Sequence, residues 1–198
     1  MSNFDIFRYT QRLKQADAIN PQMLFDFFYL ASELKRVPRK GWKSKVGIEH
    51  PESVADHSYG TAIMAMVFSD TCSLDTEKIL KMALLHDLAE SITGDFMPEE
   101  ITKENKRTAE NEAMVEILAK LPENIAIKYQ NIWEEYTQAN TKESVLLHEV
   151  DKLEMAIQAA KYSSEGFSNE KLSVFVDSAK KEIKSKELLD ILDTLSYK

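Results

Sequence analysis

Several residue types that mark other kinds of protein are scarce in this chain. Its 198 residues include one cysteine, five glycines and five prolines. The single cysteine, Cys72, excludes an intrachain disulfide and a zinc site built from cysteine pairs, and it fits a reducing cytoplasm. Alternation of apolar and polar residues, the pattern of a half-buried strand, is almost absent. We therefore expect helix nearly throughout, in an all-α protein.

Other absences narrow the possible functions. The sequence has no glycine-rich dinucleotide loop and no Walker-type loop, and its net charge of −8 disfavours a surface for nucleic acid. The N-terminus lacks the basic start and apolar core of a signal peptide. Apolar runs such as 23–34 and 61–68 are too short or too interrupted to span a bilayer. We expect a cytoplasmic protein that binds neither membrane nor nucleic acid.

The chain is long enough for one domain and short for two, so residues 1–198 are predicted to form a single domain. Between residues 35 and 51 two prolines and two glycines predict a loop. Apolar periodicity and capping residues predict helices over about 3–17, 21–34, 53–71, 75–94, 98–120, 123–138, 142–162 and 170–195.

The most informative residues are His86 and Asp87, which follow the apolar run 79–85. Neither side chain is stable in an apolar setting without a partner, and a metal ion can satisfy both. His57 and Asp151 also lie in apolar stretches, on the inward faces of two other predicted helices. Two histidines and two aspartates form a plausible set of ligands for a divalent cation.

Two further acidic residues follow the His–Asp pair. Helical spacing places Glu90 one turn beyond His86, next to whatever His86 binds. Asp95 follows Gly94, where the chain can fold back over the end of the helix. Each of these residues alone could be an ordinary core histidine, a paired carboxylate or a helix cap. Their combination on the inward faces of three helices favours a site.

A basic segment interrupts this acidic protein. Residues 35–45 contain six positive charges and no acid, and they lead directly into the helix that carries His57. Such a segment can be a solvated loop or a patch for an acidic partner. It can also bind a phosphate through arginine, with Trp42 offering a flat face to a sugar or base.

The ordered set of motifs resembles the HD-domain metal-dependent phosphohydrolases, and within them the 5′-deoxynucleotidase branch. The resemblance runs from about residue 24 to 162, and a C-terminal helix over about 170–195 follows it. The motifs are Arg39-Lys40-Gly41-Trp42, Glu52-Ser53-Val54-Ala55-Asp56-His57-Ser58, His86-Asp87-Leu88-Ala89-Glu90, Gly94-Asp95, Trp133-Glu134-Glu135-Tyr136 and Asp151-Lys152-Leu153-Glu154-Met155.

The resemblance implies an all-helical HD-domain bundle around one divalent cation, with a homodimer as the common assembly. The cation would be Mn²⁺, Co²⁺, Fe²⁺, Zn²⁺ or Mg²⁺. Its implied ligands are His57, His86, Asp87 and Asp151.

Roles for the remaining residues also follow from the resemblance. Glu90 would be the acid/base group or a ligand of a second ion, and Asp95 would lie near the sugar or that ion. Arg39 would hold the phosphate and Trp42 would stack on the sugar. Family members in bacteria have the arginine and tryptophan adjacent, so Arg36 competes with Arg39.

Our hypothesis is metal-dependent hydrolysis of a (deoxy)nucleoside 5′-monophosphate to nucleoside and phosphate. A nucleotide phosphodiesterase or a triphosphohydrolase on the same site is the first alternative, with Lys103, Lys106 and Arg107 as the extra cationic groups for a triphosphate. A non-catalytic, metal-stabilised binding module is the second, and it would need neither Glu90 nor the basic segment.

Overall fold

The computed structural model describes residues 20–195, so the predicted helix over 3–17 lies outside the described residues. Within this range the protein is helical, with no strand and a single isolated bridge between Pro38 and Ser53. The longer helices are α2 (Pro21–Glu33), α3 (Val54–Thr71), α4 (Thr76–Leu85), α6 (Lys103–Leu118), α7 (Glu123–Gln138), α8 (Lys142–Ser164), α9 (Asn169–Glu182) and α10 (Lys186–Asp193). The expected all-α fold is confirmed.

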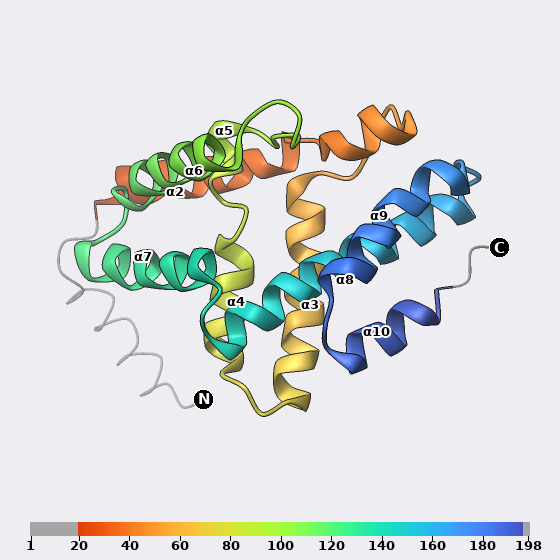
Figure 1. The fold of residues 1–198 in the computed structure, drawn as a ribbon. Coiled ribbons are helices and arrows are strands. Elements are labelled where there is room, and N and C mark those ends of the chain that lie inside the picture. Colours follow the sequence, from red (N-terminus) through yellow and green to blue (C-terminus); the bar gives the residue numbers. More distant parts are fainter. Residues whose placement is uncertain (1–19, 196–198) are drawn as a thin grey trace, which may run out of the picture.

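Helix α8 organises the core. It packs against α3, α4, α7, α9 and α10, and in Figure 1 it runs through the centre of the bundle across α3. Its sequence is apolar on several sides, and Leu147, Val150 and Ala156 are fully buried. A helix that is apolar nearly all round is stable only when neighbours cover it on most sides. The polar residues of α8 are therefore carried into the interior with it.

Helix α3 begins where the sequence predicts. Ser53 caps it by accepting from the amide of Asp56, and the Asp56 carboxylate accepts from the amide of Ser53 in return. This reciprocal pair fixes the first turn of the helix. His57 follows in that turn, so the cap also fixes the direction of its imidazole.

The predicted helix over 75–94 is wrong as a single element. Helix α4 ends at Leu85, residues 86–89 form tight turns, and a short helix α5 spans Glu90–Thr93. The amides of Leu88 and Glu90 donate to carbonyls three residues earlier, which closes turns instead of helix. The apolar pattern continues through Leu88 and Ala89 because the turn itself is buried, and periodicity cannot detect such a break.

Three other segments also differ from the prediction. Helix α6 starts at Lys103 and not at 98, because Thr102 is the residue that caps it. The segment predicted as loop contains a 3₁₀ turn, η1 (Leu34–Arg36), and a π-type turn, η2 (Trp42–Val46). The predicted final helix over 170–195 is two helices, since Ile183 is extended and separates α9 from α10.

The start of α10 depends on a buried carboxylate of α8. Glu149 accepts hydrogen bonds from the amides of Lys184 and Ser185, at 2.8 and 3.2 Å to its Oε1. A helix leaves its first amides without partners inside the helix, and this side chain supplies acceptors for the segment that enters α10. Glu149 is 6% exposed, so water cannot replace it.

Glu149→Leu should therefore lower the free energy of unfolding by about 1–3 kcal/mol, because two partly buried amides lose their acceptor. Urea denaturation of the purified variant measures this change. Glu112→Leu, at an exposed position in the middle of α6, is the control and should stay near the wild-type value. Equal stability of the two variants would contradict the capping role.

Candidate metal and active site

His57 lies at the crossing of α3 and α8, completely buried, with carboxylates on both edges of its ring. Its Nδ1 is 2.6 Å from Oε2 of Glu154. On the opposite edge, Nε2 is 3.0 Å from Oδ1 of Asp151 and 3.7 Å from Oδ2 of Asp87. A carboxylate can only accept, so the short contact with Glu154 requires a proton on Nδ1.

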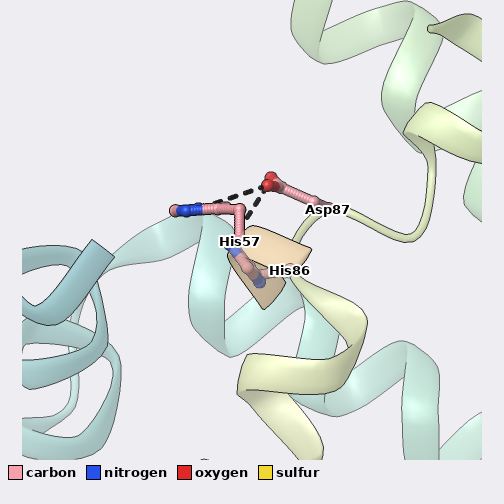
Figure 2. A group of neighbouring side chains, drawn as sticks. All are labelled: His57, His86 and Asp87. Carbon is pink, nitrogen blue, oxygen red and sulfur yellow. Dashed lines mark ion pairs between the residues drawn. The ribbon is translucent and has the colours of Figure 1, made fainter. Parts of the chain in front are cut away.

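His86 and Asp87 stand in the turn that ends α4. Nδ1 of His86 donates to the carbonyl of Ala83 at 2.7 Å, which fixes its proton on that nitrogen because a carbonyl only accepts. Nε2 of His86 lies 3.2 Å from Oδ2 of Asp87. Figure 2 shows both imidazoles directed toward the Asp87 carboxylate.

The atoms that meet here lack partners of their own. Nε2 of His57, Nε2 of His86 and Oδ2 of Asp87 are buried without a hydrogen bond. Asp151 Oδ1, although 3.0 Å from Nε2 of His57, is not aligned for one. One donor atom from each of His57, His86 and Asp87 lies within 4.8 Å of the others. Buried polar atoms without partners are rare, and this nitrogen and oxygen set fits a divalent cation.

The charges of the site favour a cation as well. Burial would raise the pKa of Asp87, but His86, His57 and Arg39 hold it well below its usual range. Burial likewise opposes ionisation of Asp151, yet Lys152 and His57 keep its pKa well below normal. For His57, burial and Arg39 lower the pKa, but the neighbouring carboxylates of Asp151 and Glu154 outweigh them and raise it to about 9. Both aspartates are thus ionised, and their negative charges favour a bound cation.

Glu90 begins α5 beside this cluster and is 2% exposed. Its Oε2 has no partner, and its Oε1 is 3.7 Å from Nζ of Lys106. Burial, and then the charges of Asp87 and Asp95, raise the pKa of Glu90 to about 9. A carboxyl group of this kind holds a proton close to the predicted metal ligands, which is the property of a general acid or base.

Asp95 ties the chain after α5 to the basic segment. Gly94 adopts a positive φ of 73° and ends α5. The carboxylate of Asp95 then accepts from the amide of Lys40 at 2.7 Å. The fold-back that the sequence predicted at Gly94 is present, and it brings the basic segment to the edge of the site.

The two arginines of the basic segment have different surroundings. Nη1 of Arg39 lies 3.6 Å from Oδ2 of Asp87, and its side chain is 17% exposed. Arg36 pairs with Glu33, within its own turn, and its side chain is 77% exposed. Of the two, Arg39 is the one that lies beside the metal-ligand cluster.

Trp42 is 1% exposed and turned into the core. Its ring lies against Phe175, with 4.0 Å between the ring centroids, and its Nε1–H donates to Glu52 at 2.9 Å. Burial, followed by the charge of Glu154, raises the pKa of Glu52 to about 7. The indole is therefore a neighbour of the acids Glu52 and Glu154, which lie behind His57.

A cavity of about 320 Å³ opens beside the cluster, between the basic segment, the chain after α5, and helices α8 and α9. Charged groups line it on the side of the cluster, and apolar side chains line much of the rest. Its walls include Arg39, Trp42, Asp95, Phe96, Met97, Lys152, Met155, Phe175, Ser178 and Glu182.

Some residues of the site were not singled out by sequence reasoning. Glu154 received no role, although it lies in the same all-round apolar helix that drew attention to Asp151. Lys152, which also received no role, pairs with Asp151 at 3.0 Å. Lys106 reaches Glu90, whereas Lys103 and Arg107 are exposed on α6.

No described helix is both long enough and apolar enough to cross a bilayer.

Comparison with known proteins identifies the family. Residues 31–190 match a family model described as an HD domain. The human protein named 5′-deoxynucleotidase HDDC2 is 37% identical over 173 residues, which cover 87% of this chain and 84% of the human protein. The Schizosaccharomyces pombe 5′-deoxynucleotidase hdd1 is 42% identical over 154 residues, covering 75% of this chain and 77% of that protein.

A solved structure extends the likeness to three dimensions. The crystal structure of the PH0347 protein from Pyrococcus horikoshii OT3 has a TM-score of 0.72 and 34% identity, with 86% of this chain and 97% of that chain covered. The sequence likeness and the shared helical architecture both agree with a fold that has the His86–Asp87 pair at its centre. This chain belongs to the HD domain family.

Proposed function

We propose that this protein is a metal-dependent 5′-nucleotidase that hydrolyses nucleoside 5′-monophosphates, preferably deoxynucleotides, to nucleoside and phosphate. The single observation that carries the proposal is a buried set of unpartnered nitrogen and oxygen atoms, beside an arginine, at the edge of a nucleoside-sized cavity. Relatives that carry the name 5′-deoxynucleotidase support the choice of substrate.

We assign the metal to His57, His86, Asp87 and Asp151. When bound, a divalent cation supplies charge neutralisation at the phosphate and an activated water near neutral pH. The contacts with Glu154 and Ala83 place a proton on Nδ1 of each imidazole, so each Nε2 would offer its lone pair to the ion. Mixed nitrogen and oxygen ligands suit Mn²⁺, Co²⁺, Fe²⁺ or Zn²⁺. The choice among these ions and Mg²⁺ remains a prediction to test.

Arg39 and Glu90 perform the remaining chemistry in this proposal. Arg39 presents a planar set of donors to the phosphate oxygens, on which negative charge develops during the displacement. Glu90 exchanges the proton, because its unpartnered Oε2 is buried beside the ligand Asp87. Asp95, which accepts from the amide of Lys40, lines the cavity, and we assign it to the sugar.

Several finer assignments remain predictions. A second ion on Glu90 and Asp95 would have to compete with Lys106 and with the amide of Lys40. Stacking of Trp42 on the sugar would have to occur beside Phe175, which already contacts its ring. The homodimer and the cytoplasmic location rest on the family resemblance and on the lone cysteine.

The triphosphohydrolase alternative receives little support from α6. Lys106 is engaged by Glu90 and Glu110, and the other two candidate cations are exposed. A non-catalytic module would have no use for a buried carboxyl group beside the ligands. Both alternatives are separated from the proposal by the products that the enzyme releases.

Removal of the metal should abolish activity. Protein stripped with EDTA is expected to release no phosphate, and Mn²⁺ or Co²⁺ should restore turnover of nucleoside monophosphates, faster for the deoxy series. A panel of ribo- and deoxyribonucleoside mono- and triphosphates, assayed for phosphate and for triphosphate release, makes the measurement. Tight metal binding without turnover of any of these would favour the binding module.

Glu90→Gln should reduce kcat by at least about 100-fold, because the amide cannot exchange the proton. The same variant should bind Co²⁺ as the wild type does, since Glu90 is assigned no contact with the single ion. Glu112→Gln, exposed on α6, is the matched control and should retain full activity. Unchanged turnover in Glu90→Gln would remove Glu90 from the mechanism.

Arg39→Lys should lower kcat/KM by about 100-fold, because a lysine cannot form the paired bonds that an arginine makes to phosphate. Arg36→Lys tests the competing arginine and should leave kcat/KM unchanged, given that this side chain is largely exposed and pairs with Glu33 in its own turn. Steady-state kinetics with a deoxynucleoside monophosphate decide between them. The opposite pattern would assign the phosphate to Arg36.

A further inference from the structure

Two glutamates, the half-buried Glu52 and the buried Glu154, lie behind His57, on the edge of its ring that faces away from the predicted metal. Oε2 of Glu154 is 2.6 Å from Nδ1, and one carboxylate oxygen of Glu52 lies within 4.8 Å of both the ring and Glu154. Glu154 is 5% exposed. No role in the proposed reaction accounts for these two acids.

Glu52 is itself held from two directions. The indole N–H of Trp42 donates to its Oε1 at 2.9 Å, and its own amide donates to the hydroxyl of Tyr162 at 2.8 Å. The indole in turn packs against the rings of Phe175 and Tyr162, whose centroids lie 4.0 and 5.2 Å from its own. A packed aromatic group therefore fixes the acid that stands beside Glu154.

The position of Glu154 has a direct consequence for His57. An acceptor at Nδ1 keeps the proton on that nitrogen, so that Nε2 presents a lone pair toward Asp87 and Asp151. A negatively charged acceptor also makes the imidazole a stronger ligand. The carbonyl of Ala83 fixes the tautomer of His86 in the same way but carries no charge.

We propose that Glu154 is a positioning residue for the metal ligand His57, and that Trp42, by fixing Glu52 beside Glu154, sets the electrostatic surroundings of that acid. In this arrangement Trp42 affects the metal centre indirectly, through Glu52 and Glu154 on the side of His57 that faces away from the metal. It needs no contact with the nucleotide. The inference rests on the metal centre of the proposed function and not on the identity of the substrate.

The space around Glu154 is matched to this role. Gly60 of α3 faces it so closely that a Cβ at that position would lie 2.7 Å from Oε1 and 3.0 Å from Cγ of Glu154. Any side chain at Gly60 would move the carboxylate away from its present position. Gly60→Ala therefore disturbs Glu154 without removing its charge and offers a second, independent test.

The primary test compares two buried glutamates on one helix. Glu154→Gln should lower the affinity for Co²⁺ or Zn²⁺ by about 10-fold, since loss of the charged partner of a ligating histidine has effects of that size. Glu149→Gln changes a carboxylate of equal burial on α8, whose partners are the amides of Lys184 and Ser185. It should leave metal affinity unchanged even if it lowers the melting temperature. Competition with a chromophoric chelator, without nucleotide, measures both.

Proton NMR of the zinc-loaded protein adds a readout that a purely structural role would not affect. The Nδ1–H of His57, bonded to a carboxylate at short distance, should give a strongly downfield resonance. This resonance should shift upfield in Glu154→Gln, weaken in Gly60→Ala and stay in place in Glu149→Gln. Equal metal affinity in Glu154→Gln and wild type, or an equal loss in Glu149→Gln, would overturn the proposal.

Trp42→Phe keeps the aromatic packing and removes the indole donor. We expect a loss of metal affinity smaller than that of Glu154→Gln but already present without nucleotide. Unchanged metal affinity together with a raised KM would instead assign Trp42 to the substrate and overturn its place here. Tight metal binding by the wild type without turnover would refute the proposed function alone and leave this inference standing.

Discussion

The whole arrangement depends on one buried imidazole. His57 sits at the crossing of α3 and α8 with Glu154 on one edge of its ring and Asp151 on the other. Removing several ionisable groups from water is unfavourable unless each is paired. The pairing exists here because α8 brings both acids into the core, one helical turn apart, and the capped first turn of α3 directs the ring between them. The rest of the site is built around this contact.

The end of α4 supplies the other half of the site, and its geometry explains why a cation belongs there. His86 and Asp87 occupy the C-terminal end of the helix, where unpaired carbonyls create a partial negative charge. An aspartate at that position is unfavourable in isolation and becomes favourable once a positive charge is near. Arg39 and His57 provide part of that charge, and the unpartnered Oδ2 of Asp87 leaves room for more.

The sequence allowed much of this to be predicted, and the errors have definite physical causes. Buried polar residues in apolar helices identified His57, His86 and Asp87 correctly as neighbours, because burial of such side chains demands partners that are themselves buried. Glu154 is also a charged residue in an apolar helix, but this pattern could not indicate that Glu154 would contact a histidine, or on which edge of the ring. The break after Leu85 escaped prediction because an apolar turn and an apolar helix have the same pattern. The inward orientation of Trp42 is set by Phe175, more than 100 residues away, and no local pattern reports such a contact.

The charge balance of the site links metal binding to folding. Without an ion, the acids around His57 raise its pKa to about 9. At neutral pH a second proton on the imidazole therefore supplies part of the positive charge that a metal ion would provide. That proton cannot remain on Nε2 when the nitrogen becomes a ligand, and metal binding must therefore release it. A ligand that binds only the folded state adds its binding free energy to stability. Lys152 and Arg39 lower the repulsion among the acids, but the two Nε2 atoms and Asp87 Oδ2 still have no hydrogen-bond partner. A divalent cation on the proposed ligands, and not a further side chain, would therefore complete the charge balance of this buried centre.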